Sequence, residues 1–341
     1  MAATIKDIAR ELNISISTVS YALNDGPRTV PPEVKERVLA VARQMDYRPN
    51  KIARSMVTGR ADTIAVIPPR DAHSMILSPY LQIVLNGIIE AGEDMGQDIL
   101  LRTTFAEADP VAAVQTLQSG KADGMILIAP YSDSRLAEAA ATQNFPCVVF
   151  SSDAPPGTLS ISVDNREAIF KALDYLTEIG HRKIGHLIGR DGLRDAGLRY
   201  RAYREYCREY NLPLQEEWVK HGGFTYQGGR EAAEKILSLA DRPTALLAGN
   251  DESGVGAIDA ALALGLRVPQ DISIVGFDML PHEIFALRHL TSIRQPIHEM
   301  AKSSVALLTQ WTRTGEIPLP ASRLFPAELV VQDTTAPPSV E

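Results

Sequence analysis

Residues 4–24 read TIKDIARELNISISTVSYALN, and this stretch decides the fold of the N-terminal part of the chain. In its first half, apolar residues recur at positions 5, 8, 9 and 12, which is the spacing of one face of an α-helix. Thr4, with Asp7 three residues later, has the form of a capping box at the start of that helix. Asn13 tolerates the left-handed backbone that a tight turn needs. The pattern predicts a first helix over residues 5–12, closed by a turn.

A second helix is predicted over residues 16–24, with Ser15 as its cap. Val19, Ala22 and Leu23 point inward at helical spacing, and Ser, Thr, Tyr and Asn side chains are left facing out. Short, uncharged polar side chains suit close approach to phosphates and to base edges in the major groove of DNA. The alternative is a plain three-helix domain with a polar, solvated face.

The segment that follows favours the DNA-binding interpretation. Pro31-Pro32 opens a third helix, which we expect to end near residues 47–50. Residues 51–56, KIARSM, could form about one and a half helical turns, and a helix of that length is unstable alone in water. We expect this short segment to become ordered only when DNA and a second copy of the chain pack against it.

The charge of the chain is unevenly divided. The 341 residues carry a formal net charge of −8, which by itself argues against a nucleic-acid partner. Residues 1–60, however, contain 10 Lys and Arg against 6 Asp and Glu, whereas the remainder contains 24 against 36. A small basic head on an acidic body favours DNA contact at the head.

From residue 61 onward, short apolar runs alternate with amphipathic stretches, and the cycle restarts after Asp164-Asn165. Two successive cycles of this kind predict two doubly wound parallel-sheet lobes. A ligand would then sit in the cleft between them, near the strand ends. The expected strands are residues 63–67, 98–101, 124–128 and 147–150 in the first cycle, and 183–188, 245–248 and 272–277 in the second.

Three motifs follow one another in the N-terminal part of the chain, namely TIKDIA at 4–9, SISTVSYALN at 15–24, and YRPN at 47–50 with ARSM at 53–56. Together they closely resemble the head and hinge of the LacI/GalR family of bacterial transcriptional regulators. The rest of the chain resembles the periplasmic-binding-protein-like core of that family, so the resemblance covers nearly the whole chain. It implies an all-α helix-turn-helix head followed by an α/β core of two lobes, with lobe crossings near residues 161, 293 and 322. The implied domains are a DNA-binding domain at 1–49, a hinge helix and linker at 50–60, a ligand-binding and dimerisation core at 61–332, and a tail at 333–341.

The resemblance also implies DNA contacts. In the family, the second helix reads the major groove, and the hinge helices of a dimer enter the minor groove at the operator centre. Ile16 offers no hydrogen bond, so we expect an apolar contact there, such as one with a thymine methyl. Met56 stands where the family usually has a leucine wedged into the central base step. By position, Ile16, Ser17 and Tyr21 would contact bases, Ser15, Thr18, Ser20 and Asn24 would contact phosphates, and Asn50, Ala53 and Met56 would act in the hinge.

Candidate ligand residues lie just after the predicted strands of the core. Arg199 occupies the place of the family's ligand-binding arginine, and Tyr80 and Phe224 match positions where the family often has an aromatic. Such a set suits a polyol, because Asp and Asn span neighbouring hydroxyls, Arg supplies a fixed fork of donors, and an aromatic face covers a sugar ring. The alternatives are that Asn250 caps a helix, that Phe224 is core, and that Asp195 pairs with Arg199. The full set is Tyr80, Ser151, Asp153, Arg199, Phe224, Asn250, Asp278 and Gln295.

These features imply a repressor of carbohydrate-utilisation genes that a sugar in the cleft releases from its operator. The alternative is a purine- or nucleoside-responsive regulator whose ligand acts as a corepressor. One head reads only half of a near-palindromic operator, so we expect a homodimer. The tail has no heptad pattern, so the tetramerising helix of some relatives is not expected.

Other classes of protein are disfavoured. The chain has no G-x-S-x-G elbow, P-loop or H-E-x-x-H motif, and its seven histidines lack metal-ligand spacing, so we expect no catalysis, cofactor or metal. Two isolated cysteines, Cys147 and Cys207, make no disulfide framework. With neither a signal-peptide pattern nor a long apolar run, we expect a cytoplasmic protein with no membrane span. A transport solute-binding protein would need a secretion signal where this chain carries its head.

Overall fold

The computed structural model describes residues 3–24, 29–47, 55, 59–70, 78–102, 108–281 and 289–339. The chain divides into two compact units, Met1–Ala61 and Asp62–Glu341, each of which is described by itself. Within these described residues, no helix is long and apolar enough to cross a bilayer.

The N-terminal unit is a helix-turn-helix domain, as predicted. Its helices are α1 (Ile5–Leu12), α2 (Ile16–Asn24) and α3 (Pro32–Gln44). They pack around a small apolar core in which Ile8, Val19 and Val38 are fully buried. Leu39 is 38% exposed, because the inner face of α3 is carried by Val38 and Ala42.

Local hydrogen bonds set the ends of the first two helices. The Thr4 backbone N–H donates to Asp7 Oδ2 at 3.0 Å, which is one half of the predicted capping box. Asn13 has a φ of 52°, the left-handed conformation expected at the turn. The Thr18 N–H donates to Ser15 Oγ at 3.0 Å, so Ser15 caps α2. These sequence signals are local, which is why they could be read without the rest of the fold.

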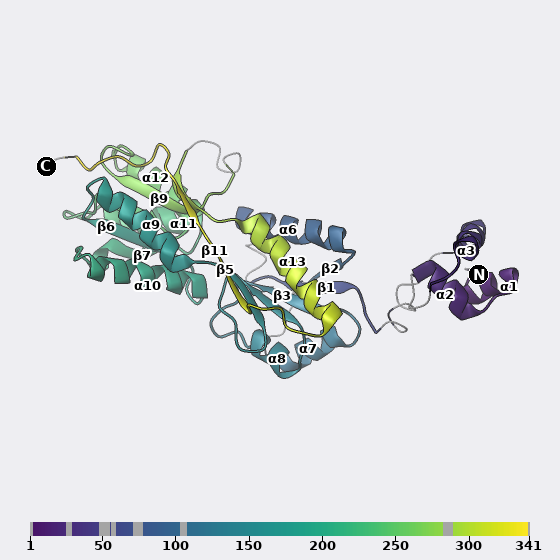
Figure 1. Cartoon of the computed structure of the whole chain (residues 1–341). Coiled ribbons are helices and arrows are strands. Elements are labelled where there is room, and N and C mark those ends of the chain that lie inside the picture. The colour runs from purple at the N-terminus through teal and green to yellow at the C-terminus, as the bar shows by residue number, and fades with distance from the viewer. Residues whose placement is uncertain are drawn as a thin grey trace. The chain divides into compact units, whose positions relative to one another are not determined.

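The first lobe of the larger unit is a parallel sheet of six strands in the order β11-β5-β4-β3-β1-β2. Figure 1 shows α13, from late in the chain, lying beside α6 on one face of this sheet. The elements are β1 (Thr63–Ile67), α6 (Pro79–Met95), β2 (Asp98–Leu101), α7 (Pro110–Gln118), β3 (Gly124–Ile128), α8 (Leu136–Thr142), β4 (Cys147–Phe150), β5 (Leu159–Val163), α13 (Ile297–Thr314) and β11 (Ser322–Phe325).

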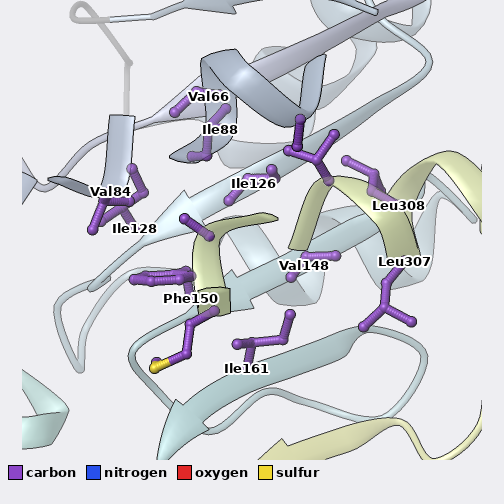
Figure 2. Packing of buried hydrophobic residues seen from close by; sticks show 14 of the residues in the cluster. Val66, Val84, Ile88, Ile126, Ile128, Val148, Phe150, Ile161, Leu307 and Leu308 are labelled. Carbon is purple, nitrogen blue, oxygen red and sulfur yellow. The ribbon is translucent and has the colours of Figure 1, made fainter. Parts of the chain in front are cut away.

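The main core of this lobe lies between the sheet and the pair α6 and α13. Figure 2 shows side chains from the strands meeting side chains of the two helices. Gly87 lets α6 and α13 approach closely, since a Cβ there would lie 2.8 Å from the Ala301 Cβ. The labelled residues from the strands are Val66, Ile126, Ile128, Val148, Phe150 and Ile161, and those from the helices are Val84, Ile88, Leu307 and Leu308.

The second lobe repeats the architecture with the strand order β12-β10-β9-β8-β6-β7. All described pairs are parallel except the edge pair of β12 with β10. The two-lobed, doubly wound fold predicted from the sequence is therefore confirmed. The elements are α9 (Asn165–Glu178), β6 (Ile184–Ile188), α10 (Arg194–Glu209), a 3₁₀ turn (Glu216–Trp218), β7 (Val219–His221), α11 (Tyr226–Leu237), β8 (Ala245–Ala248), α12 (Asp251–Ala263), β9 (Ser273–Asp278), β10 (Thr291–Arg294) and β12 (Glu328–Val330).

The chain crosses between the lobes three times, slightly later than expected at each point. The first crossing lies at Asp164, between β5 and α9. The second lies at residues 295–296, between β10 and α13, and the third lies at residues 326–327, between β11 and β12. Beyond β12 the chain stays bound to the second lobe. The Ile274 N–H donates to the Thr334 carbonyl at 2.8 Å, and Thr334 Oγ1 donates to the Ile274 carbonyl at 2.7 Å.

Candidate functional site

The second helix of the head presents the predicted polar face. Ser15 and Ser17 are exposed, Thr18, Ser20 and Tyr21 are partly exposed, and the apolar Ile16 is 49% exposed. An exposed isoleucine at the start of such a helix is costly in water and suits an apolar contact with a base edge.

Hydroxyl groups at the start of α2 are linked to one another. Ser15 Oγ lies 2.7 Å from both Ser17 Oγ and Thr18 Oγ1, so the cap also orders two neighbouring hydroxyls. This places three polar side chains together at a helix N-terminus, where backbone N–H groups favour phosphate. Of the remaining DNA-contact candidates, the Asn24 side chain, Asn50, Ala53 and Met56 lie outside the described residues.

A cavity of about 230 Å³ lies between the two lobes of the larger unit. The first lobe contributes residues that precede or begin α6 and that follow β3 and β4, and the second contributes residues from α10, α12 and the ends of its strands. Six of the eight predicted ligand residues line it, namely Tyr80, Ser151, Arg199, Phe224, Asn250 and Asp278.

Arg199 is the buried cation of the cavity, at 4% exposure. Its Nε donates to Asn165 Oδ1 at 2.9 Å, and its Nη1 donates to the Gly249 carbonyl at 2.7 Å. The guanidinium carbon lies 3.6 Å from the centroid of the Phe277 ring. These contacts hold the guanidinium plane in one orientation, as a recognition site requires.

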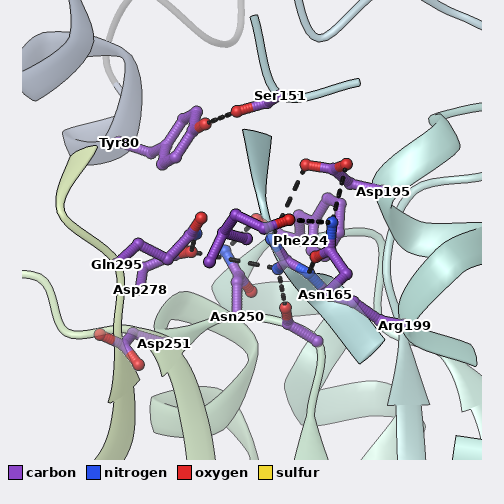
Figure 3. A network of polar contacts seen from close by, with 12 residues as sticks. Tyr80, Ser151, Asn165, Asp195, Arg199, Phe224, Asn250, Asp251, Asp278 and Gln295 are labelled. Carbon is purple, nitrogen blue, oxygen red and sulfur yellow. Dashed lines mark hydrogen bonds and ion pairs between the residues drawn. The ribbon is translucent and has the colours of Figure 1, made fainter. Parts of the chain in front are cut away.

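Two buried carboxyl groups flank this guanidinium (Figure 3). Asp195 Oδ2 lies 3.9 Å from Arg199 Nη2, and Asp278 Oδ1 lies 4.0 Å from Arg199 Nη1. Burial raises the pKa of Asp195 to about 6, although the Arg199 charge and the Asn165 amide oppose this shift. Burial likewise raises the pKa of Asp278 well above its ordinary value, and Arg199 again opposes it. Both groups can therefore accept hydrogen bonds or, when protonated, donate them.

Gln295 supports Asp278 from behind the cavity. Its Nε2 donates to Asp278 Oδ1 at 2.5 Å, and it is buried without lining the cavity. Asp278 itself has a φ of 118°, a rare backbone conformation for a residue other than glycine. Strain of this kind persists where the surrounding structure over-determines it, which is common at binding sites.

Asn250 and Phe224 form one wall together. Asn250 Oδ1 accepts from the Ser253 N–H at 3.0 Å, so it caps α12, and its Nδ2 donates to the Phe224 carbonyl at 3.2 Å. The helix-cap alternative therefore holds for Asn250, although its side chain also lines the cavity. Phe224 has a φ of 60° and faces the cavity, and Gly189 makes room for its ring.

Tyr80 and Ser151 form the wall from the first lobe. Their hydroxyl groups are hydrogen-bonded to each other, and burial raises the pKa of Tyr80, which therefore stays protonated at neutral pH (Figure 3). Asp153, in contrast, does not line this cavity. Its Oδ2 lies 3.0 Å from Arg194 Nη1, so it joins the first lobe to the second at the rim.

Several residues of the site were not among the predicted ligand set. Asn165 bridges Arg199 and Asp195, because its Nδ2 also donates to Asp195 Oδ1 at 3.2 Å. Glu252 lines the cavity and accepts from Ser78 Oγ of the other lobe at 3.1 Å. Asn165 and Glu252 each stand at the beginning of a helix that follows a strand, and that position is the only sequence signal they carry. Arg190 and Asp195, which also line the cavity, follow β6 in the same way.

The charges around the cavity are nearly balanced. Three carboxyl groups, those of Asp195, Glu252 and Asp278, line it together with the guanidinium groups of Arg190, Arg194 and Arg199. The arrangement offers many donors and acceptors beside two aromatic rings, with equal numbers of acidic and basic side chains. It suits a neutral ligand rich in hydrogen-bonding groups.

Comparisons with known proteins agree with both units. Residues 4–50 match the family model of bacterial regulatory proteins, lacI family, and residues 173–335 match that of the periplasmic binding protein-like domain. The HTH-type transcriptional repressor PurR of Yersinia pestis (strain Pestoides F) is 32% identical over 310 residues, which cover 90% of this chain and 89% of that protein.

Two solved structures share the fold. The Lac repressor dimer bound to operator and the anti-inducer ONPF superimposes with a TM-score of 0.85 at 24% identity, over 98% of this chain and 100% of that one. The transcriptional regulator CelR in complex with cellobiose gives a TM-score of 0.72 at 24% identity, over 97% and 99% of the two chains.

Proposed function

Because this chain belongs to the lacI family of bacterial regulatory proteins, and is thus a DNA-binding repressor and not an enzyme, we propose that it represses carbohydrate-utilisation genes and leaves its operator when a sugar binds between its lobes. The observation that carries the choice of ligand is the cavity around Arg199. There a fixed guanidinium, two flanking carboxyl groups and the Phe224 ring converge on one space. Hydroxyl groups of a sugar would bond to the polar set, and the ring would cover its apolar face.

The proposed DNA contacts are made by the exposed face of α2. Ile16, Ser17 and Tyr21 would meet bases, while Ser15, Thr18, Ser20 and Asn24 would meet phosphates. We place Asn50, Ala53 and Met56 at the centre of the operator, in the hinge of each subunit. A repressor of this kind would act in the cytoplasm, where its operator lies.

The proposed active form is a homodimer on a near-palindromic operator, because one head reads only half a site. The exposed apolar side chains of Ile89 on α6 and Leu101 on the neighbouring strand β2 support this, since a second copy would cover them. A sedimentation mass of two chains is expected, and a mass of one or four chains at the concentration that saturates the operator would contradict the dimer.

The proposed mechanism is differential binding to two arrangements of the lobes. A ligand that contacts Tyr80 and Ser151 from one lobe and Arg199 from the other favours the arrangement in which all three reach it. The change in lobe arrangement would alter the spacing of the paired hinges and so the affinity for the operator. Typical coupling of this kind is ~1–3 kcal/mol.

A second candidate ligand is a purine or nucleoside that acts as a corepressor. The two aromatic residues Tyr80 and Phe224 favour it, because they come to the cavity from different lobes and could lie against a flat ring. This candidate differs from the first in the sign of its effect, since a corepressor tightens operator binding.

A thermal-shift screen of the full-length protein against sugars, sugar phosphates, nucleosides and purines separates the two candidates. A ligand at 100 times its Kd stabilises the folded state by ~2.7 kcal/mol, which is readily measured. A selective response to sugars supports the first proposal, and a response to purines alone supports the second. If no compound in either class shifts the melting temperature, the ligand proposal fails and only the DNA-binding function stands.

A further inference from the structure

A second, larger cavity adjoins the one between the lobes. It is an open groove of about 740 Å³ along the N-terminal half of α10, and it shares Arg190, Leu193 and Arg194 with the first cavity. Its lining comes mainly from the second lobe, including Tyr200, with Asp153 and Ser132 added by the first. Ligand cavities of globular proteins are about 300–1,000 Å³, so the first cavity, which is the more enclosed of the two, is smaller than usual, whereas the two together fall within that range.

The partition between the two cavities is thin. The Ser132 N–H of the first lobe donates to the Gly192 carbonyl of the second at 2.8 Å, which fixes the backbone of the shared loop. The Arg194 side chain, however, is about one-third exposed and is held by its contact with Asp153 at 3.0 Å. A surface ion pair of this kind is worth only ~0–1 kcal/mol, so a ligand can displace the side chain at little cost. The Arg194 side chain is therefore the part of the boundary that a bound molecule could pass, whereas Leu193 is buried and its backbone bridges to Tyr131 of the first lobe.

Gly197 in α10 lacks the packing reason that explains other helical glycines of this lobe. A Cβ at Gly229 or Gly256 would lie 2.3 or 2.1 Å from backbone atoms, so those positions must be glycine. A Cβ at Gly197 would meet nothing within 4 Å, and this residue lines the groove. Glycine inside a helix costs ~0.5–1 kcal/mol relative to alanine. A group that approaches the helix backbone closely from the groove would explain the glycine, because no described atom of the protein does.

The side chains of the groove suit a neutral polar molecule. Besides the shared arginines it contains the exposed Arg201 and Glu216, and the pair His221 with Asp191, whose Nδ1 and Oδ1 atoms are 2.8 Å apart. Cations and carboxylates are again balanced, as they are in the enclosed cavity. The partly exposed Tyr200 adds an aromatic side chain to the wall. One chemistry, hydroxyl-rich and uncharged, therefore fits both cavities.

We propose that the effector is a saccharide of at least two rings, with one ring in the enclosed cavity and the next beyond Arg194, in the groove against Gly197 of α10. This inference rests on the proposed sugar-responsive function and adds the length of the ligand to it. The residues of the groove, above all Arg201, then distinguish longer saccharides from a single ring.

The first test measures the melting temperature of the full-length protein and its Kd for the saccharides of three series. Each series runs from one ring to three: glucose, cellobiose and cellotriose; glucose, maltose and maltotriose; and xylose, xylobiose and xylotriose. In one of these series, the disaccharide is expected to bind at least tenfold more tightly than the monosaccharide. If a monosaccharide binds as tightly as its longer relatives, this inference is wrong while the proposed function stands. If no saccharide binds, both are wrong.

The second test fills the groove without touching the enclosed cavity. Gly197→Phe is expected to weaken binding of the best disaccharide at least tenfold and Gly197→Ala to weaken it less, because the Cβ of alanine fills only part of the space beside the helix, and both variants should bind the monosaccharide as the wild type does. Unchanged disaccharide binding by a folded Gly197→Phe variant would overturn the inference. If melting without ligand shows that this variant is unfolded, Arg201→Ala replaces it. Arg201→Ala is expected to lose affinity severalfold for the disaccharide only, and an unchanged Kd for the disaccharide would contradict the inference.

Discussion

Arg194 Nη1 in the second lobe lies 3.0 Å from Asp153 Oδ2 in the first, and this ion pair joins the two lobes at the rim of the ligand cavity. Two further polar contacts cross between the lobes nearby, from Ser132 to Gly192 and from Ser78 to Glu252. These three contacts lie at the cavity or at its rim, and they help to hold the lobes in this arrangement. A ligand that adds its own contacts across the cavity can shift such a balance, since its differential affinity has only a few kcal/mol to overcome.

Asp153→Asn tests the contribution of this ion pair. Although partial burial raises the pKa of Asp153, the hydrogen bond and charge of Arg194 lower it below its ordinary value, so the pair is intact at neutral pH. Loss of a surface pair of ~0.2–1 kcal/mol should weaken binding of a single-ring ligand, which leaves the pair intact, about 1.4- to fivefold and make it less sensitive to salt. Asp241→Asn, which breaks a pair with Lys183 inside one lobe, is the control. Equal ligand affinity in both variants would show that the interlobe pair has no role.

Relative to the wild type, Asp195→Asn should stabilise the protein more at neutral pH than at acid pH. Burial raises the pKa of Asp195 to about 6, above its ordinary value of 3.8, with Arg199 opposing the shift. A raised folded-state pKa means that stability is fully present below the ordinary value and is lost as the pH rises through about 6. The variant lacks this loss. Its unfolding free energy minus that of the wild type should therefore rise by ~2–3 kcal/mol between pH 4 and pH 7. Urea unfolding at both pH values measures it, and a difference that does not change with pH would contradict the account.

Gly189→Ala should impair ligand binding by moving Phe224. An added Cβ would lie 2.0 Å from Phe224 Cζ, so the ring must shift toward the cavity. Overpacking costs ~1–3 kcal/mol, which corresponds to about a five- to 150-fold loss of affinity if the bound state bears it. Gly222→Ala is a matched control, because its Cβ would meet no atom closer than 3.4 Å. Calorimetric titration with the ligand found in the screen compares the affinities of the two variants. If Gly189→Ala binds the ligand as tightly as the wild type does, Phe224 does not contact the ligand.

Tyr21→Ala should remove selective operator binding without affecting ligand binding. Tyr21 is partly exposed on α2, in the unit of residues 1–61, whereas the ligand cavity lies wholly in the other unit. Loss of a good base contact costs ~1–3 kcal/mol of discrimination, so the preference for operator over random DNA should fall about five- to 150-fold. Fluorescence anisotropy measures this preference, with an operator that the wild type has selected from random DNA. Tyr210→Ala, at an exposed position of the other unit, is the control. An unchanged preference would remove Tyr21 from the DNA interface.

The parts of the fold that follow from local signals could be predicted from the sequence. The Thr4–Asp7 cap and apolar runs such as those of β1 and β3 need no distant partner to be recognised. The strand β5 was missed because serines alternate with apolar residues in LSISV, although every residue of it is buried. Ser160 is satisfied by donating to Ser322 Oγ of β11 at 2.9 Å, a partner 162 residues away. Burial of such a strand depends on long-range pairing that its own residues do not reveal.

The candidate site shows the same division. Arg199, Phe224, Asn250 and Asp278 could be proposed because polar or aromatic residues after parallel strands meet at one edge of a sheet. Sequence alone could not distinguish residues that line the cavity from those behind or beside it. Gln295 supports Asp278, and Asp153 pairs across the rim, because the packing of two lobes decides where each side chain ends. The bridge that Asn165 forms between Arg199 and Asp195 depends on that packing as well.

The central claim is that a small molecule between the lobes controls operator affinity, and the most direct test is the operator Kd of the full-length protein with and without the best compound of the screen. The account predicts that saturating sugar weakens operator binding of the wild type about five- to 150-fold, the usual range of such coupling. Arg199→Ala, with melting as a check on folding, should bind operator equally well with and without the sugar. An unchanged operator Kd in ligand-saturated wild type would contradict the claim.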